Sequence, residues 1–212
     1  MAAVVAALLA WDAAWKRREE AARRPPPTDV LAKNLVENII GRNSVKTVKV
    51  DEATGVVEVT FESATYPPAA RATTAGEILP KQLDALTPGA RVTKGQPLVY
   101  VKGPGGAEVV GASADHAGKV VQVLVKAGDK VDENRAVVLI EPDDKTEARQ
   151  NLETEGLLAW QAIISQLNQI KTVTSRIVYN DATLATVVGV RGEKAVKTTY
   201  HESLKLSRSA RC

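Results

Sequence analysis

Residues 117–142 have the sequence AGKVVQVLVKAGDKVDENRAVVLIEP. Valine-rich runs stand on both sides of a turn at Gly128-Asp129, and a further apolar run continues to Pro142. β-Branched residues favour strands, and glycine supplies turn conformations that a β-carbon would oppose. This stretch therefore predicts two strands joined by a tight turn, followed by a third strand.

The same pattern occurs a second time, earlier in the chain. Residues 75–103, AGEILPKQLDALTPGARVTKGQPLVYVKG, can be laid over residues 117–142, with three extra residues before the glycine turn of the first copy. The alternating valines and leucines of the two copies are expected to meet across two small sheets. We therefore predict a β-domain over residues 71–142, with turns defined by Gly76, Gly89, Gly118, Gly128 and Asp129.

The segments GKVVQVLVKAGDKV at 118–131 and PGARVTKGQPL at 88–98 resemble the biotinyl/lipoyl domain family. Members of that family are flattened β-barrels made of two similar halves, so the resemblance implies a lipoyl-like barrel-sandwich hybrid. Carrier members bear biotin or lipoate on a lysine at the hairpin between the halves. Here the family's acceptor position falls near Gly105, and Lys102 stands three residues earlier. The resemblance therefore implies no bound cofactor, with modification of Lys102 as the alternative.

A branch of the same family has no acceptor lysine and is similar to this chain in its order of segments. These are the membrane-fusion, or periplasmic adaptor, proteins of efflux and secretion systems. Their chain runs from a membrane-anchored N-terminus through one half of the domain, an α-helical hairpin and the second half. In this sequence a few glycine-rich residues replace the α-helical hairpin, which normally reaches the partner channel.

The N-terminal segment is the most apolar part of the chain. Residues 1–15, MAAVVAALLAWDAAW, contain one charged residue, and KRREEAARRPPP follows them. A comfortable membrane span needs about 20 residues, and a signal peptide places its basic residues before the apolar run. Three interpretations stay open: a short or half-spanning membrane helix, an interfacial helix, or a helix docked on a partner. In each, residues 1–24 form an anchor through Leu8, Leu9, Trp11, Trp15, Lys16, Arg17 and Arg18.

Residues 25–70 are predicted to hold a linker, a short helix and a β-hairpin. Consecutive prolines form the linker because proline cannot continue a helix. Thr28 or Asp29 is expected to cap the helix at its start, Gly41 is expected to follow its end, and its apolar face is made of Leu31, Leu35 and Ile39.

Residues 143–212 are predicted to form a helix followed by three β-strands. An aspartate caps the helix, Gly156 weakens its middle, and its apolar stripe comprises Leu157, Trp160, Ile164, Leu167 and Ile170. The whole chain is therefore expected to be mainly β, with flanking helices.

Composition gives little support for catalysis, metal binding or nucleic-acid binding. The 28 basic and 25 acidic residues leave a net charge of +3, and no basic run is interleaved with aromatic residues. The histidines His116 and His201 with the single Cys212 give no metal-ligand spacing, and no nucleophile elbow or phosphate-binding loop occurs. Asp115-His116 is interpreted as part of a solvated loop.

These observations together predict a non-catalytic structural or accessory subunit of a membrane-associated complex. Its β-domain would serve as a rigid interaction module, and its partners would be integral membrane proteins and the membrane surface or lipid. The alternatives are a shortened membrane-fusion adaptor and a biotinyl/lipoyl carrier modified at Lys102. The sequence leaves open on which side of the membrane the chain lies.

Overall fold

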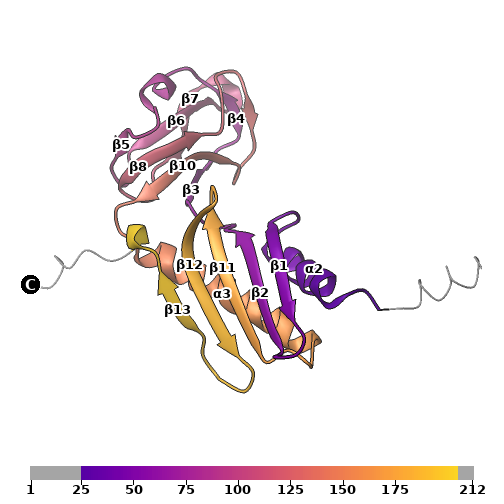
Figure 1. The fold of residues 1–212 in the computed structure, drawn as a ribbon. Coiled ribbons are helices and arrows are strands. Elements are labelled where there is room, and N and C mark those ends of the chain that lie inside the picture. Colours follow the sequence, from indigo (N-terminus) through magenta and orange to yellow (C-terminus); the bar gives the residue numbers. More distant parts are fainter. Residues whose placement is uncertain (1–24, 205–212) are drawn as a thin grey trace, which may run out of the picture.

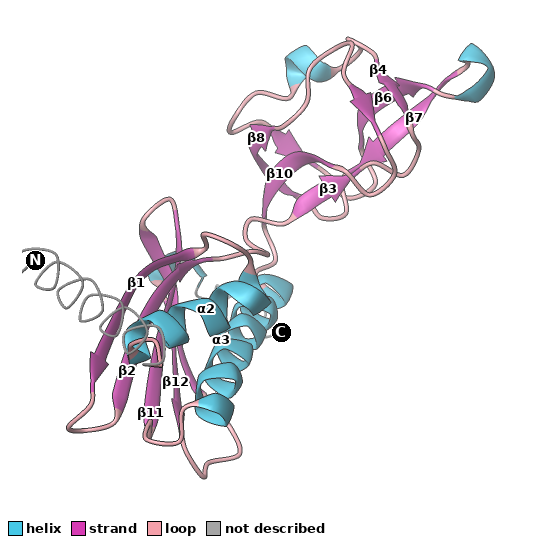
Figure 2. Ribbon diagram, turned by 90° about the vertical axis from the view of Figure 1, so that its right-hand side faces the viewer, coloured by secondary structure: helices cyan, strands magenta, loops and turns pink. Residues whose placement is uncertain are grey.

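A computed structural model describes residues 25–204. Over this range the chain forms two lobes, each with its own hydrophobic core. One lobe is a five-stranded sheet with two helices on one face, and the other is a barrel of two four-stranded sheets (Figures 1 and 2). The prediction of a mainly β chain with flanking helices is confirmed at this level, while the predicted anchor at residues 1–24 lies outside the described residues.

The sheet lobe is built from the two ends of the described chain. Its first part comprises α2 (Thr28–Ile40), β1 (Val45–Asp51) and β2 (Val56–Glu62). Its second part comprises α3 (Thr146–Gln166), β11 (Thr172–Tyr179), β12 (Ala182–Val190) and β13 (Lys197–Tyr200). Residues 28–62 and 146–200, which were assigned to separate regions from the sequence, thus share one sheet.

The strands of this sheet are ordered β1-β2-β11-β12-β13, so the sheet follows chain order once the inserted barrel is set aside. All neighbouring pairs are antiparallel except β2 and β11, which are parallel. A parallel pair needs a crossover connection, and α3 supplies it. The barrel is inserted into this same connection, between β2 and α3.

The two faces of the sheet differ because successive strand residues point to opposite sides. One buried row, aligned across β2, β11 and β12, lies on the helix side and comprises Val59, Ser175 and Val187. The next row lies on the open side and comprises Thr60, Arg176 and Thr186.

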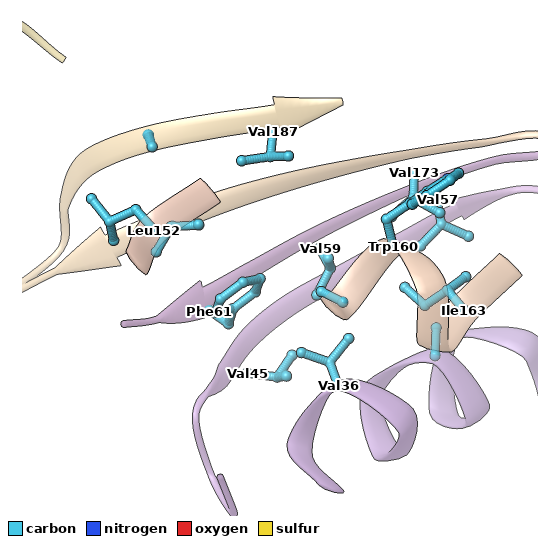
Figure 3. Close-up of a cluster of buried hydrophobic side chains, with 14 of the residues drawn as sticks. Val36, Val45, Val57, Val59, Phe61, Leu152, Trp160, Ile163, Val173 and Val187 are labelled. Atoms are coloured by element: carbon cyan, nitrogen blue, oxygen red, sulfur yellow. The ribbon is translucent and has the colours of Figure 1, made fainter. Parts of the chain in front are cut away.

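Helix α2 buries a different face from the one predicted. Its fully buried residues are Ala32 and Val36, whereas Ile39 is 45% exposed. Leu31 and Leu35 are only partly buried against the core. Figure 3 shows Val36 pointing from α2 toward Val45 of β1. Small side chains let the helix lie close to the sheet, so helical spacing alone did not identify the buried face.

The start of α2 also differs from the expectation of a side-chain cap. Pro27 occupies the N-cap position, and no side chain caps the helix. The Thr28 hydroxyl instead donates a hydrogen bond to Glu52, in the loop between β1 and β2, over 3.0 Å.

Helix α3 runs unbroken through Gly156, the position at which the sequence predicted a weakened middle and a possible break. A β-carbon at Gly156 would lie 2.4 Å from the Val187 side chain of β12. A β-carbon at Gly189 of β12 would likewise lie 2.4 Å from the Trp160 ring. The helix and the strand therefore interlock, because each places a large side chain over a glycine of the other. Close packing, and not a break, explains why glycine stands in this helix.

The barrel runs from residue 69 to residue 142. Its first half comprises β3 (Ala69–Arg71), β4 (Gly76–Ile78), β5 (Arg91–Val92) and β6 (Pro97–Lys102). Its second half comprises β7 (Glu108–Ser113), β8 (Gly118–Val123), β9 (Lys130–Val131) and β10 (Ala136–Pro142). Short 3-10 turns lie at Leu83–Ala85 and Pro104–Gly106.

The two halves of the barrel are related by a twofold exchange of strands. One sheet has the order β3-β10-β8-β5 and the other has the order β7-β6-β4-β9. The strands β3 to β6 of the first half correspond in chain order to β7 to β10 of the second half. Exchanging each strand with its counterpart converts one order into the other. Corresponding hydrogen bonds follow the same exchange. The Gly128 amide donates to the Ile78 carbonyl over 2.8 Å, and the Gly89 amide donates to the Val120 carbonyl over 2.8 Å.

The glycines predicted to define turns fall into two groups. Gly89 and Gly128 have positive φ values of 88° and 86°, in the left-handed region that favours glycine. Gly76 and Gly118 are not in turns but begin β4 and β8, where another strand passes closely. A β-carbon at Gly118 would lie 2.2 Å from the Glu141 carbonyl oxygen. Asp129 accepts a hydrogen bond from the Lys126 amide over 2.9 Å, which closes the second turn.

Candidate functional site

The junction between the barrel and the sheet lobe is the candidate site, because buried polar groups and adjacent crossings of the chain meet there. The chain enters the barrel through residues 63–68, here called the first crossing, and returns through residues 143–145, the second crossing. The two crossings lie side by side, because Ala69 of β3 pairs with Leu139 of β10. The Ile140 amide also donates to the Pro68 carbonyl over 3.0 Å. The barrel is thus attached at a single point.

The first crossing is held by Glu155 on α3. Its Oε1 accepts hydrogen bonds from the Ser63 hydroxyl at 3.1 Å, the Ala64 amide at 3.0 Å and the Thr65 amide at 2.9 Å. The Ser63 hydroxyl oxygen in turn accepts from the Tyr66 amide at 3.0 Å. One helical carboxyl group therefore binds two backbone amides and a hydroxyl at the point where the chain leaves the sheet.

Tyr66 closes the core beneath the junction. Its ring stands edge-on to Tyr179 of β11, with ring centroids 5.9 Å apart. Burial raises the pKa of Tyr66 to about 12, and the nearby charge of Glu141 acts in the same direction. Glu141 accepts a hydrogen bond from the Lys145 ammonium over 2.8 Å, so the two crossings share one polar contact region.

An ion pair joins the outside of the barrel to the second crossing, and a histidine–carboxylate contact joins it to α3. Arg91 lies 2.5 Å from an oxygen of Asp143, and the His116 ring lies 3.5 Å from the carboxylate of Glu147. Hydrogen bonds from Thr146 lower the pKa of Asp144. His116 therefore contacts a carboxylate of α3, whereas the sequence pointed only to its neighbour Asp115.

Lys102 lies at the end of β6 and not at the tip of the hairpin. The tip is formed by Gly105 and Gly106, with positive φ values of 79° and 82°. Lys102 is aligned with Glu77 on one neighbouring strand and with Glu108 on the other. Lys102 therefore stands between two carboxylates across the sheet, and one of them, Glu108, forms an ion pair with Lys81.

A second lysine, Lys81, lies beside these carboxylates. The Lys81 ammonium is 2.5 Å from Glu108 and 4.5 Å from the centre of the Tyr100 ring. The hydrogen bond to Glu108 is the main reason that the pKa of Lys81 is raised. The outer face of this sheet is thus a mixed-charge surface with one aromatic ring.

The extra residues of the first half create a shallow cavity of about 320 Å³. It lies between the Leu83–Ala85 turn and the end of β8, and its apolar lining comprises Pro80, Leu83, Leu86, Val123, Val125 and Ala127. Asp84 and Lys126 complete the lining. The cavity breaks the symmetry of the barrel, because the second half lacks the corresponding extra residues.

Within residues 25–204, no group of three or more histidine, cysteine, aspartate or glutamate side chains could hold a metal ion. No helix in the same range is long and apolar enough to cross a bilayer. The predicted anchor residues all precede residue 25, so the described part of the chain does not include them.

The comparisons with known proteins give no match, either to models of protein families or to curated protein sequences.

Proposed function

We propose that this chain is a non-catalytic scaffold subunit of a membrane-associated complex. Its barrel is an interaction module carried on the sheet lobe, and residues 1–24 attach the chain to a membrane or a membrane protein. One observation carries the proposal: the barrel is inserted into a single sheet connection, through two adjacent crossings of which one is bound to a buried carboxyl group. Such an attachment presents a compact module in a defined orientation.

The finer description of the barrel is part of the same proposal. The twofold exchange of four-stranded sheets supports a lipoyl-like barrel-sandwich hybrid. The short connection between β6 and β7, at residues 103–107, supports a module that lacks the α-helical hairpin of membrane-fusion adaptors. The shortened adaptor is therefore a variant of the scaffold proposal, in which the barrel surface itself contacts the partner.

The experiment that tests the proposal is membrane fractionation in the native source, with mass spectrometry of the proteins that copurify in mild detergent. We expect the full chain to sediment with membranes and to bring integral membrane proteins in fixed stoichiometry. A chain lacking residues 1–24 should stay in the supernatant and keep its melting temperature. Recovery of the full chain alone in the soluble fraction would refute membrane attachment.

A carrier modified at Lys102 is the second candidate, favoured by the strand order of the barrel and by a lysine next to its hairpin. The same purified protein tests it through the mass of the peptide that contains Lys102. A biotinyl or lipoyl increment on Lys102 would support the carrier. Unmodified Lys102 in protein from the native source would exclude the carrier and would agree with the scaffold proposal.

A further inference from the structure

Glu155 occupies an unusual position for an acidic residue. It is 4% exposed, on the side of α3 that faces the sheet. While Oε1 accepts three hydrogen bonds, Oε2 is buried with no hydrogen-bond partner among the described residues. Burying an ionised carboxylate with an unpaired oxygen is unfavourable, whereas the neutral acid loses much less on leaving water.

All three groups that donate to Oε1 belong to residues 63–65, the start of the first crossing. A change at this carboxyl group therefore acts directly on the point where the barrel joins the sheet. Oε2 is buried, and Leu152 and Ala159 on the same helix are buried in the hydrophobic core, so water does not compensate for a new charge at Oε2.

The elements around Glu155 carry several titratable or charged side chains. They include Lys46 on β1, Glu62 on β2, Tyr66 in the first crossing, Tyr179 on β11, Glu141 and Lys145 at the second crossing, and Arg149, Glu153 and Glu147 on α3 itself. Glu62 is paired with Lys46, and Glu141 with Lys145. No charged side chain is among the causes that shift the pKa of Glu155.

We propose that Glu155 is a proton-dependent latch that holds the first crossing, and with it the orientation of the barrel, on the sheet lobe. The neutral carboxyl group keeps residues 63–65 bound to α3. Loss of its proton places a charge at Oε2 and loosens the segment. The inference rests on the proposed function in one respect: a latch on the barrel has a purpose only if the orientation of the barrel affects its binding to a partner.

The direction of the pH dependence follows from burial. Burial raises the pKa of Glu155 above its ordinary value of 4.5, and the hydrogen bonds from Thr65, Ser63 and Ala64 oppose this shift without cancelling it. The folded chain therefore holds this proton more tightly than the unfolded chain does. The stabilisation is fully present below pH 4.5 and is lost as the pH rises through the folded-state pKa.

Hydrogen exchange of the purified full chain tests the latch. Protection factors of the Ala64 and Thr65 amides, corrected for the intrinsic exchange rate, should fall above pH 4.5, by up to about tenfold per pH unit. The Gly128 amide, bonded inside the barrel, should not follow this profile. Glu155→Gln is permanently neutral and should abolish the pH dependence. Glu153→Gln, a change at an exposed glutamate of the same helix, should keep the wild-type profile.

Two results would overturn the proposal. One is a wild-type profile without pH dependence while the chain stays folded, and the other is the same pH dependence in Glu155→Gln. If the glutamine variant does not fold, the carboxyl carbon resonance of Glu155 in the wild-type chain decides the question. A titration midpoint above 4.5 supports the latch, and one at or below 4.5 excludes it. These measurements need no membrane, so they fail or succeed independently of the fractionation experiment.

Discussion

Single glycines of the barrel have one of two physical roles: they allow another strand to pass closely, or they adopt a positive φ. Gly118→Ala would drive a β-carbon against the Glu141 carbonyl, which is backbone and cannot move aside. We expect a loss of about 1–3 kcal/mol in the free energy of unfolding, as for overpacked cores. Denaturant titration measures it. An unchanged midpoint would show that β8 and β10 do not approach as closely as the structure has them.

Gly128 tests backbone conformation alone, because a β-carbon there would meet no atom within 4 Å. Gly128→Val should destabilise the fold by more than about 1 kcal/mol, since β-branched residues strongly disfavour positive φ. Asparagine tolerates this region, so Gly128→Asn should recover much of the loss. Equal losses in the two variants would mean that positive φ is not the cause.

The interlock between α3 and β12 operates at the scale of secondary-structure elements. Gly189→Ala should push the Trp160 ring away from the sheet and destabilise the sheet lobe by about 1–3 kcal/mol. Trp160→Leu removes the obstructing ring, so the double variant should lose less than the sum of the two single variants. Strict additivity in denaturant unfolding would contradict the contact.

The C-terminal end of α3 depends on one arginine of the loop after β12. Arg191 donates from Nε to the Ile170 carbonyl at 2.8 Å and from a terminal nitrogen to the carbonyls of Ile164 and Leu167, at 2.7 Å and 2.9 Å. A positive charge is favourable at a helix C-terminus. Arg191→Met should therefore destabilise the chain by about 1–3 kcal/mol in thermal or denaturant unfolding.

Arg191→Lys is the matched control for this cap. Lysine keeps the charge but lacks the planar fork that reaches three carbonyls, so an intermediate loss is expected. A lysine variant as stable as the wild type would show that charge alone, and not the hydrogen-bond geometry, holds the helix end.

Two separate cores predict two folding units at the scale of the whole molecule. Residues 68–143 contain the complete barrel core, and the ends of this segment lie together because β3 and β10 are paired. We expect this segment to fold when expressed alone, with a β-type circular dichroism spectrum and a cooperative thermal transition. An unfolded segment would show that the barrel requires the sheet lobe.

Calorimetry of the full chain extends the same prediction. Gly118→Ala should lower the transition of the barrel, and Gly189→Ala should lower that of the sheet lobe, because each change lies in one core. A single transition that both variants shift equally would indicate that the junction couples the lobes into one cooperative unit.

The features that follow directly from the amino-acid sequence are local ones. Alternating valines specify strands through a two-residue period, and Gly89 and Gly128 specify turns through a backbone conformation that few residues adopt. The internal repeat made two matching sets of strands predictable, and the position of Lys102 before a glycine-rich tip was visible without a structure.

Which distant segments meet depends on the folded chain, because the apolar pattern within one element does not specify the segment it packs against. The parallel pairing of β2 with β11, across the whole barrel insertion, could not be found from local pattern. The same holds for Gly156 beneath Val187 and for the buried face of α2. Glu155 gave no signal as one of several glutamates in a helix. Its importance comes from long-range contacts to residues 63–65, which exist only after the chain has folded.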